Sequence, residues 1–173
     1  MNKTEKTPDD LAALFKKLPA QDYAQAGEIG KTLVAGGANT VRLLVSLVGD
    51  EFGAADGAKP KEALHALVIY ASRPGAGAER KVVAETLSKE LAAEHSEELK
   101  AFVTRQLQLC GREEDVPSIA RLLGSDRLCE PATQAIVAIG GKAARQALQE
   151  ALPQSADQRK VTISQAVDLL SAR

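Results

Sequence analysis

The stretch RLCEPATQAIVAIGGKAARQALQEAL, residues 127–152, decides the fold class because it predicts two short helices joined by a turn. The first half is rich in alanine and leads into the pair Gly140-Gly141. Glycine adopts the left-handed backbone conformation that ends a helix at little steric cost. The second half places Leu148 and Leu152 four residues apart, which is the spacing of one apolar helix face. This stretch therefore predicts a helix–turn–helix unit.

The rest of the chain shows the same helical pattern. Of 173 residues, 30 are alanine and 21 are leucine, whereas only five are aromatic. Alanine and leucine favour helices, and the β-branched and aromatic residues that favour strands are few. The composition predicts an all-α protein. Helix-breaking residues such as Gly36-Gly37, Pro74-Gly75 and Gly111 divide the chain into segments. The expected helices lie at 8–18, 22–35, 40–48, 61–72, 78–94, 97–110, 116–124, 131–139, 142–152 and 157–171.

Apolar residues recur at matching positions in the second helix of each predicted pair. Aligning these helices gives one row of Leu44, Leu87, Ile119 and Leu148, and a second row of Val48, Leu91, Leu123 and Leu152. Four residues before the first row, at Thr40, Val83, Asp115 and Ala144, we expect the pattern to fade into helix starts. One helix pair is too small to bury its apolar face, so successive pairs are expected to stack on one another.

Residues 127–152 resemble one HEAT-type repeat, of the kind also found in bilin lyases, and residues 99–125 resemble a second. Residues 23–48 and 60–91 are more loosely similar. The resemblance implies a right-handed α-α superhelix, a HEAT-like solenoid of about four to five helical pairs. It implies a single domain over residues 8–173 after a disordered N-terminal segment, residues 1–7. One departure is Glu130-Pro131, which stands where the family usually has Arg or Lys.

Two segments do not fit the repeat. Residues 49–60 are expected to form a long loop, whose Asp50, Glu51 and Asp56 lack the ligand spacing of a calcium loop and suit a solvated acidic segment. Residues 157–173 predict a first helix without its partner. This helix is either a terminal cap or the point where a longer solenoid was cut, and we expect the second because it carries paired leucines near its end.

Charge, cysteines and hydropathy limit the function classes. Lys plus Arg number 22 and Asp plus Glu 23, so the one-sided excess typical of nucleic-acid binding is absent. The polar N terminus and short apolar runs predict a cytoplasmic protein without a membrane segment. Cys110 and Cys129 have no zinc-like spacing, and we expect both to be buried and unbridged.

The motifs that might carry chemistry are weak. Residues 74–81 contain glycines and a lysine but lack the spacing of a phosphate loop, so they predict a turn between helices. The sequence does not reveal a second group that would orient His65 or His95 for acid–base catalysis, so we expect neither to be catalytic. The acidic runs at 97–98 and 113–115 fall at helix starts, where the helix dipole favours negative charge. The sequence therefore predicts a non-enzymatic protein without a metal or cofactor.

The resemblance further implies that second helices line a concave face where partners bind. The outward positions form two columns, Ser46, Lys89, Arg121, Glu150 and Arg42, Glu85, Pro117, Gln146. Neither column carries one sign of charge, which favours a protein segment over a nucleic acid as partner. The candidate partner-binding residues are Arg42, Ser46, Glu85, Lys89, Arg121, Gln146 and Glu150.

Two alternatives stay open at this point. This face is either a binding surface or merely a solvated one. The protein is either a scaffold or a HEAT-like enzyme or ligand-handling protein, of which a bilin-lyase-like protein is one case and a DNA-glycosylase-like protein a weaker one.

Overall fold

The computed structural model describes residues 8–50 and 58–172, and every regular element within these ranges is helical. The all-α prediction is confirmed. The backbone divides into two compact units, Met1–Leu87 and Ser88–Arg173, with the boundary inside one helix. The predicted single domain over residues 8–173 therefore stays a prediction, and the predicted disordered segment at 1–7 lies outside the described residues.

The helices follow the predicted order. The first unit contains α1 (Pro8–Phe15), α2 (Tyr23–Val34), α3 (Gly37–Asp50), α4 (Ala58–Ala71) and the larger part of α5 (Gly77–Glu90). The second unit contains α6 (Glu97–Cys110), α7 (Val116–Ala120), α8 (Cys129–Ile139), α9 (Gly141–Ala151) and α10 (Asp157–Ser171). Short 3-10 segments at Glu113–Asp115, Arg121–Gly124 and Leu152–Gln154 adjoin α7 and α9.

Several predicted helix boundaries are wrong. The first helix, expected over residues 8–18, ends at Phe15. The expected loop at 49–60 is shorter, because α3 continues to Asp50 and α4 begins at Ala58; the centre of that loop lies outside the described residues. Helix α5 ends at Glu90 rather than near residue 94. At this end, 3-10-type hydrogen bonds replace the α-helical ones, such as the bond from Ala92 N–H to the Lys89 carbonyl (3.1 Å). The expected helix at 116–124 changes to 3-10 geometry at Arg121.

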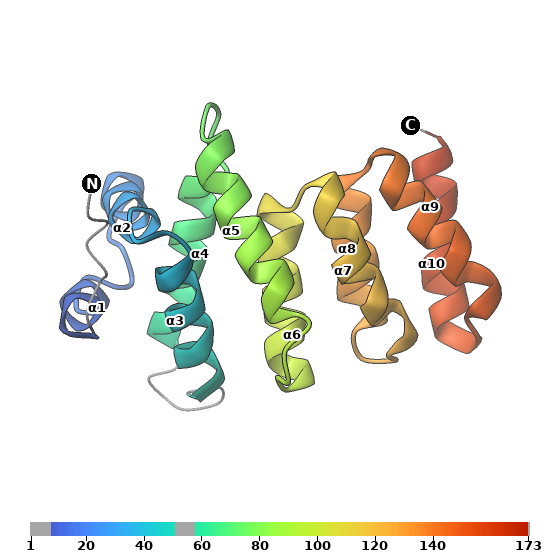
Figure 1. Cartoon of the computed structure of the whole chain (residues 1–173), viewed down its shortest axis with the longest axis horizontal. Coiled ribbons are helices and arrows are strands. Elements are labelled where there is room, and N and C mark those ends of the chain that lie inside the picture. The colour runs from blue at the N-terminus through green and yellow to red at the C-terminus, as the bar shows by residue number, and fades with distance from the viewer. Residues whose placement is uncertain (1–7, 51–57, 173) are drawn as a thin grey trace. The chain divides into compact units, whose positions relative to one another are not determined.

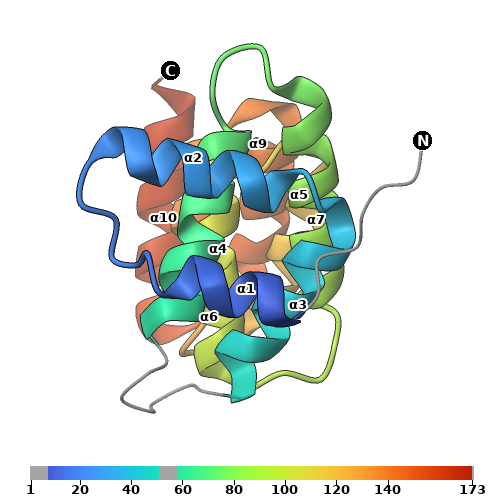
Figure 2. The same ribbon diagram turned by 90° about the vertical axis from the view of Figure 1, so that its left-hand side faces the viewer.

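In the first unit, α2 lies across α4 in close contact (Figure 2). Gly30 makes this crossing possible, because a Cβ atom there would lie 2.5 Å from the Ala66 carbonyl oxygen and 2.6 Å from Tyr70 Cβ. A contact of that length with backbone forces one of the helices to move. The small residue therefore sets how closely the two helices pack.

In the second unit, α6, α8 and α10 pack side by side as one layer, and α7 and α9 form the other (Figure 1). The first helices of successive pairs thus contact one another, and so do the second helices. The predicted first row is buried in both units: Leu44, Leu87, Ile119 and Leu148 are each 0% exposed. In the second row, Leu152 is half-buried and lies directly after the end of α9 at Ala151.

The row at Thr40, Val83, Asp115 and Ala144 does not fade as predicted, since all four residues are buried. Asp115 is only 3% exposed. Its Oδ1 accepts a hydrogen bond from the Ser88 hydroxyl (3.1 Å), and its Oδ2 accepts bonds from Arg112 N (2.9 Å) and Arg112 Nε (3.3 Å). Burying a carboxylate is tolerated only with such partners. Asp115 is therefore buried in line with the apolar residues of this row because hydrogen bonds satisfy its carboxylate.

Polar contacts also join neighbouring pairs elsewhere in the second unit. The Ser125 hydroxyl donates to Glu97 Oε1 (2.9 Å), 28 residues away in sequence. The Ala143 N–H donates to Glu113 Oε1 (2.8 Å), 30 residues away. These separations are about one helix pair, so the contacts link adjacent pairs in a constant register.

Cys110 is the last residue of α6 and Cys129 the first of α8. Neither forms a disulfide and both are buried, as predicted. They act as small apolar side chains in the packing between the helices.

No single helix in the described ranges has the length and apolar character needed to cross a membrane. Helices α2 and α3 satisfy that test only when taken together, and they are bent by 110°.

Candidate functional site

A groove of about 470 Å³ runs between α7 and α9, the second helices of two successive pairs. We call it the α7/α9 groove. Its apolar part is made of Val116, Ala120, Leu123, Ala143, Ala147 and Ala151. Its other lining residues are Pro117, Arg121, Gln146, Glu150 and Gln154. The groove thus combines a floor of mostly small apolar side chains with an exposed polar rim.

Local contacts set where the two helices of this groove begin. Gly141 has a φ of +83°, and a Cβ atom there would lie 2.8 Å from the Glu113 carboxyl carbon. Glycine leaves room for Glu113 to accept the hydrogen bond from Ala143 N–H in the first turn of α9, where the helix dipole favours an anion. In α7, Pro117 lies in the first turn, where its missing N–H costs no hydrogen bond.

The rim of the α7/α9 groove carries both signs of charge. Arg121 supplies an exposed cation, and Glu150 supplies an exposed anion that accepts a hydrogen bond from Gln146 Nε2 (2.8 Å). The Gln154 amide donates to the Glu150 backbone carbonyl (3.2 Å). These groups can hydrogen-bond a peptide backbone or pair with charged side chains. The lining residues contain no nucleophile or acid–base pair.

Three of the seven predicted partner-binding residues come together here, namely Arg121, Gln146 and Glu150. Lys89 is exposed at the end of α5 and does not line this groove. The other three, Arg42, Ser46 and Glu85, belong to the first unit.

Among those three, Arg42 and Ser46 are exposed and Glu85 is half-buried. Arg42 donates a hydrogen bond to Asn39, and Glu85 pairs with Lys81 at 3.8 Å. Whether a partner binds any of the seven residues stays a prediction.

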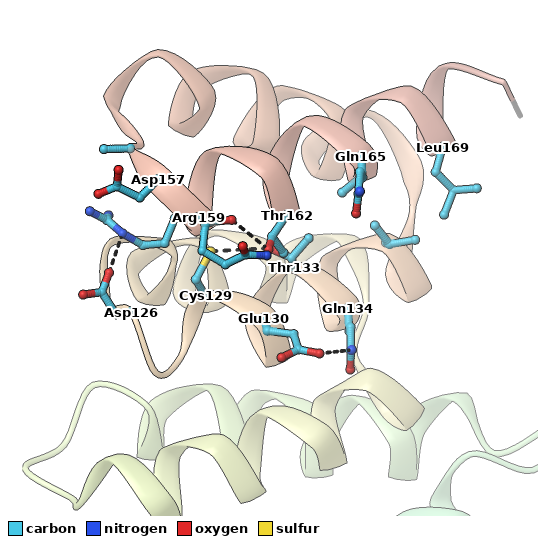
Figure 3. Close-up of a pocket in the computed structure, with 14 residues that line it drawn as sticks. Asp126, Cys129, Glu130, Thr133, Gln134, Asp157, Arg159, Thr162, Gln165 and Leu169 are labelled. Atoms are coloured by element: carbon cyan, nitrogen blue, oxygen red, sulfur yellow. Dashed lines mark hydrogen bonds and ion pairs between the residues drawn. The ribbon is translucent and has the colours of Figure 1, made fainter.

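A second groove, of about 670 Å³, lies between α8 and α10 and was missed by sequence reasoning (Figure 3). We call it the α8/α10 groove. It is lined mainly by polar side chains of the first helices, including Glu130, Thr133, Gln134, Thr162 and Gln165. The sequence feature that indicates this groove is the polar residues spaced three or four apart on each of the two helices. It was overlooked because the repeat resemblance directs attention to second helices.

Most polar groups of the α8/α10 groove bond to their own segment or to the segment beside it. Arg159 Nε lies 2.8 Å from Asp126 Oδ1, and its Nη1 donates to the Gly124 carbonyl (3.1 Å). Gln134 Nε2 donates to Glu130 Oε1 (3.2 Å). The two Arg159 contacts connect the start of α10 to the segment before α8, so they stabilise the packing of the two helices, whereas the Gln134 contact lies within α8.

Cys129 lines the α8/α10 groove but is only 2% exposed. Burial raises the pKa of its thiol, and this outweighs the lowering by its contact with the Thr133 hydroxyl at 3.9 Å. The thiol is therefore protonated at neutral pH. A protonated, buried thiol is a poor nucleophile.

The histidines are placed differently from one another. His95 Nε2 lies 2.9 Å from Glu90 Oε2, a pairing across the end of α5 that the sequence did not reveal. His65 is exposed on α4. The predicted turn at residues 74–81 is confirmed up to Ala76, since Gly75 has a φ of +83° and α5 begins at Gly77.

Within the described ranges, no group of three or more His, Cys, Asp and Glu side chains is placed to hold a metal ion. Glu51 and Asp56, considered above for calcium, lie outside these ranges, as does the side chain of Asp50.

Neither the protein-family models nor the curated proteins searched contain a match to this chain. The resemblance to HEAT repeats therefore rests on the residues quoted above, and it stays a prediction.

Proposed function

We propose that this protein is a HEAT-like repeat scaffold, a right-handed α-α superhelix, that binds a segment of another protein and catalyses no reaction. The observation that carries the proposal is the α7/α9 groove. It is formed by second helices, it has an apolar floor, and it has a rim of mixed charge. Segments of protein partners offer the same combination of apolar side chains, backbone hydrogen-bonding groups and charges.

The repeat arrangement of the second unit supports this proposal. Helices of the same kind contact one another in successive pairs, and the buried row continues from Ile119 to Leu148. Polar contacts between neighbouring pairs recur at separations close to one pair. A stack of this kind presents adjacent grooves between second helices, on which an extended segment can lie.

The charge distribution favours a protein over a nucleic acid. Phosphate binding requires cations that are not matched by nearby anions. In the α7/α9 groove, Arg121 is accompanied by Glu150, and the whole chain has a net charge of −1. A protein segment with charges of both signs complements this rim.

The compartment we propose is the cytoplasm. Neither Cys110 nor Cys129 forms a disulfide, and a reducing compartment keeps cysteines in the thiol form.

A photo-crosslinking experiment tests the proposed function. A photoreactive amino acid is placed at Gln146, inside the α7/α9 groove, and in a second sample at Arg105, an exposed residue of α6 that does not line it. After irradiation in the cells that make the protein, we expect a defined adduct with one partner protein from position 146 only. Identical adducts from both positions would contradict the proposal.

A matched pair of charge variants then tests whether the rim itself recognises the partner. Glu150→Lys reverses a rim charge, and Gln149→Lys adds a lysine at the neighbouring exposed position, which does not line the groove. We expect Glu150→Lys to weaken binding of the crosslinked partner at least tenfold and Gln149→Lys to change it less than twofold. Equal effects would show that net charge, rather than the groove, controls binding.

A further inference from the structure

A third groove, of about 480 Å³, lies in the first unit between α2, α4 and the residues just before α2. We call it the α2/α4 groove. Its walls are mostly apolar and include Leu18, Tyr23, Ile69 and Tyr70, with Glu62 among the few ionisable groups. This size and this composition, apolar with a few polar groups, are typical of small-molecule sites.

Two apolar side chains of this groove face solvent to an unusual degree. Tyr23 is 98% exposed and Ile69 is 50% exposed. A tyrosine ring normally buries much of its surface, because that burial stabilises the fold. An exposed ring beside an apolar groove is a surface on which a ligand gains contact area.

Glu62 provides the second, independent observation. Within residues 8–50 and 58–172, its Oε2 is the one buried side-chain nitrogen or oxygen that has no hydrogen-bond partner. A buried carboxylate oxygen without a donor is unfavourable, and native proteins nearly always satisfy such an atom. Glu62 as a whole is half-buried and lines the groove, so a donor on a bound ligand can reach its carboxylate once the side chain turns.

The arginine of the groove is already engaged by other groups. Arg73 Nη1 donates to Glu79 Oε2 (2.5 Å) and to the Tyr70 carbonyl (2.7 Å). The guanidinium carbon lies 3.7 Å from the centroid of the Tyr70 ring. The hydrogen bond to Glu79 also raises the pKa of Arg73, so this side chain stays charged and held at that end of the groove.

We propose that the α2/α4 groove binds a small organic cation in which an ammonium group is joined to an apolar body. The ammonium donates to Glu62, and the apolar body packs against Leu18, Ile69 and the Tyr23 ring. A charged donor matches a carboxylate better than a neutral one, and an ammonium is also attracted to an aromatic face. The last torsion of a glutamate side chain is soft, so the carboxylate can turn Oε2 toward the ligand. This site is separate from the α7/α9 groove and does not depend on a protein partner.

Tyrosine fluorescence is a direct readout of this groove. The protein has two tyrosines, Tyr23 and Tyr70, and no tryptophan, and both tyrosines line the α2/α4 groove. We would titrate the full chain with n-octylammonium and, as a neutral control of the same shape, with 1-octanol. We expect a saturable change in tyrosine emission and an affinity for the amine at least tenfold above that for the alcohol. Equal affinities, or no saturable change with the amine, would overturn the proposal.

A substitution pair tests the role assigned to the carboxylate. Glu62→Gln removes the charge in the groove, and Glu28→Gln removes an exposed carboxylate of α2 that does not line it. We expect Glu62→Gln to weaken octylammonium binding at least tenfold without changing octanol binding, and Glu28→Gln to change neither. Unchanged amine binding in Glu62→Gln would refute the proposed contact.

If circular dichroism shows that Glu62→Gln does not fold, Tyr23→Ala provides the test, because this side chain is exposed and contributes little to the core. Tyr70 then reports binding alone. We expect both ligands to bind at least fivefold more weakly to Tyr23→Ala. Unchanged affinities would show that the ligands do not bind in the α2/α4 groove.

Discussion

Both compact units are built from paired helices, but the polar contacts described for them span different distances along the chain. The ion pairs described in the first unit, such as Lys31 with Glu28 and Arg73 with Glu79, join residues three to six apart. In the second unit, Arg159 with Asp126 and Glu113 with the Ala143 N–H join residues about one pair apart. Local pairs stabilise single helices and turns, whereas the longer ones specify how successive pairs align.

This difference teaches that one repeat pattern can be positioned by two kinds of contact. In the first unit, the close approach of α2 and α4 depends on shape, through the absence of a side chain at Gly30. In the second unit, the alignment depends also on hydrogen bonds that buried or half-buried groups must satisfy, such as those of Asp115. The predictions below test this contrast.

The largest expected effect comes from truncating the buried row in each unit. Leu44→Ala and Leu148→Ala should each lower the free energy of unfolding by about 2–5 kcal/mol, because each leaves a cavity. Both tyrosines lie in the first unit, so tyrosine fluorescence follows that unit while circular dichroism follows all helices. In urea titrations, we expect Leu44→Ala to shift the fluorescence midpoint more than Leu148→Ala does. Equal shifts would show that the units unfold together.

The next largest effect is expected from removing the buried hydrogen bonds of Asp115 in the second unit. Asp115→Ala should lower the free energy of unfolding by about 2–3 kcal/mol, because it leaves the Ser88 hydroxyl and the Arg112 N–H without their acceptor. The control is Glu114→Ala, whose side chain is 74% exposed, and which should change stability by less than about 0.5 kcal/mol. Urea unfolding followed by circular dichroism measures both. Similar losses in the two variants would mean that Asp115 contributes only as a surface charge.

The shape-based contact of the first unit predicts an effect of about 1–3 kcal/mol. Gly30→Ala adds a Cβ atom that meets the backbone of α4, so it should lower the free energy of unfolding by that amount. In Gly27→Ala, the added Cβ has nothing within 4 Å, and the variant should be more stable by about 0.5–1 kcal/mol because alanine favours a helix. Opposite signs in thermal melts are the expected result. Stabilisation by both would show that α2 does not pack on α4 through Gly30.

The smallest effect concerns Cys129 and pH. Its pKa is raised in the folded state, so above about pH 8.5, the ordinary thiol pKa, the unfolded chain releases the proton and the folded chain keeps it. The free energy of unfolding should therefore fall as pH rises through this range, by less than about 1.4 kcal/mol per pH unit. In urea titrations, the free energy of unfolding of Cys129→Ala should fall less steeply than that of the unmodified protein between about pH 8 and about pH 10. The same dependence of unfolding free energy on pH in both proteins would argue against a raised pKa of the Cys129 thiol.

Much of the fold could be predicted because it depends on local pattern. The predicted helices at 97–110 and 157–171 coincide with α6 and α10, and the residues of the first row are buried. The helix register also predicted the rim residues Arg121, Gln146 and Glu150 that share the α7/α9 groove. Periodicity specifies which side of a helix is apolar, and therefore which side is left for solvent or a partner.

Other features escaped prediction because they depend on residues far apart in sequence. The burial of Asp115 requires Ser88 opposite it, 27 residues earlier. The α8/α10 and α2/α4 grooves each require two helices to lie at a particular distance. For α2 and α4, that distance is controlled by what a Cβ atom at Gly30 would meet, and periodicity contains no such information.

The amino-acid sequence by itself determined that the chain forms short paired helices with apolar rows, because helix propensity and a repeat of three to four residues act within one turn or two. Only the tertiary structure decided which polar groups are buried with partners, which carboxylate oxygen is left without one, and where grooves open between helices. The physical reason is that desolvation and packing depend on what lies opposite a side chain in space, and that neighbour comes from another helix pair.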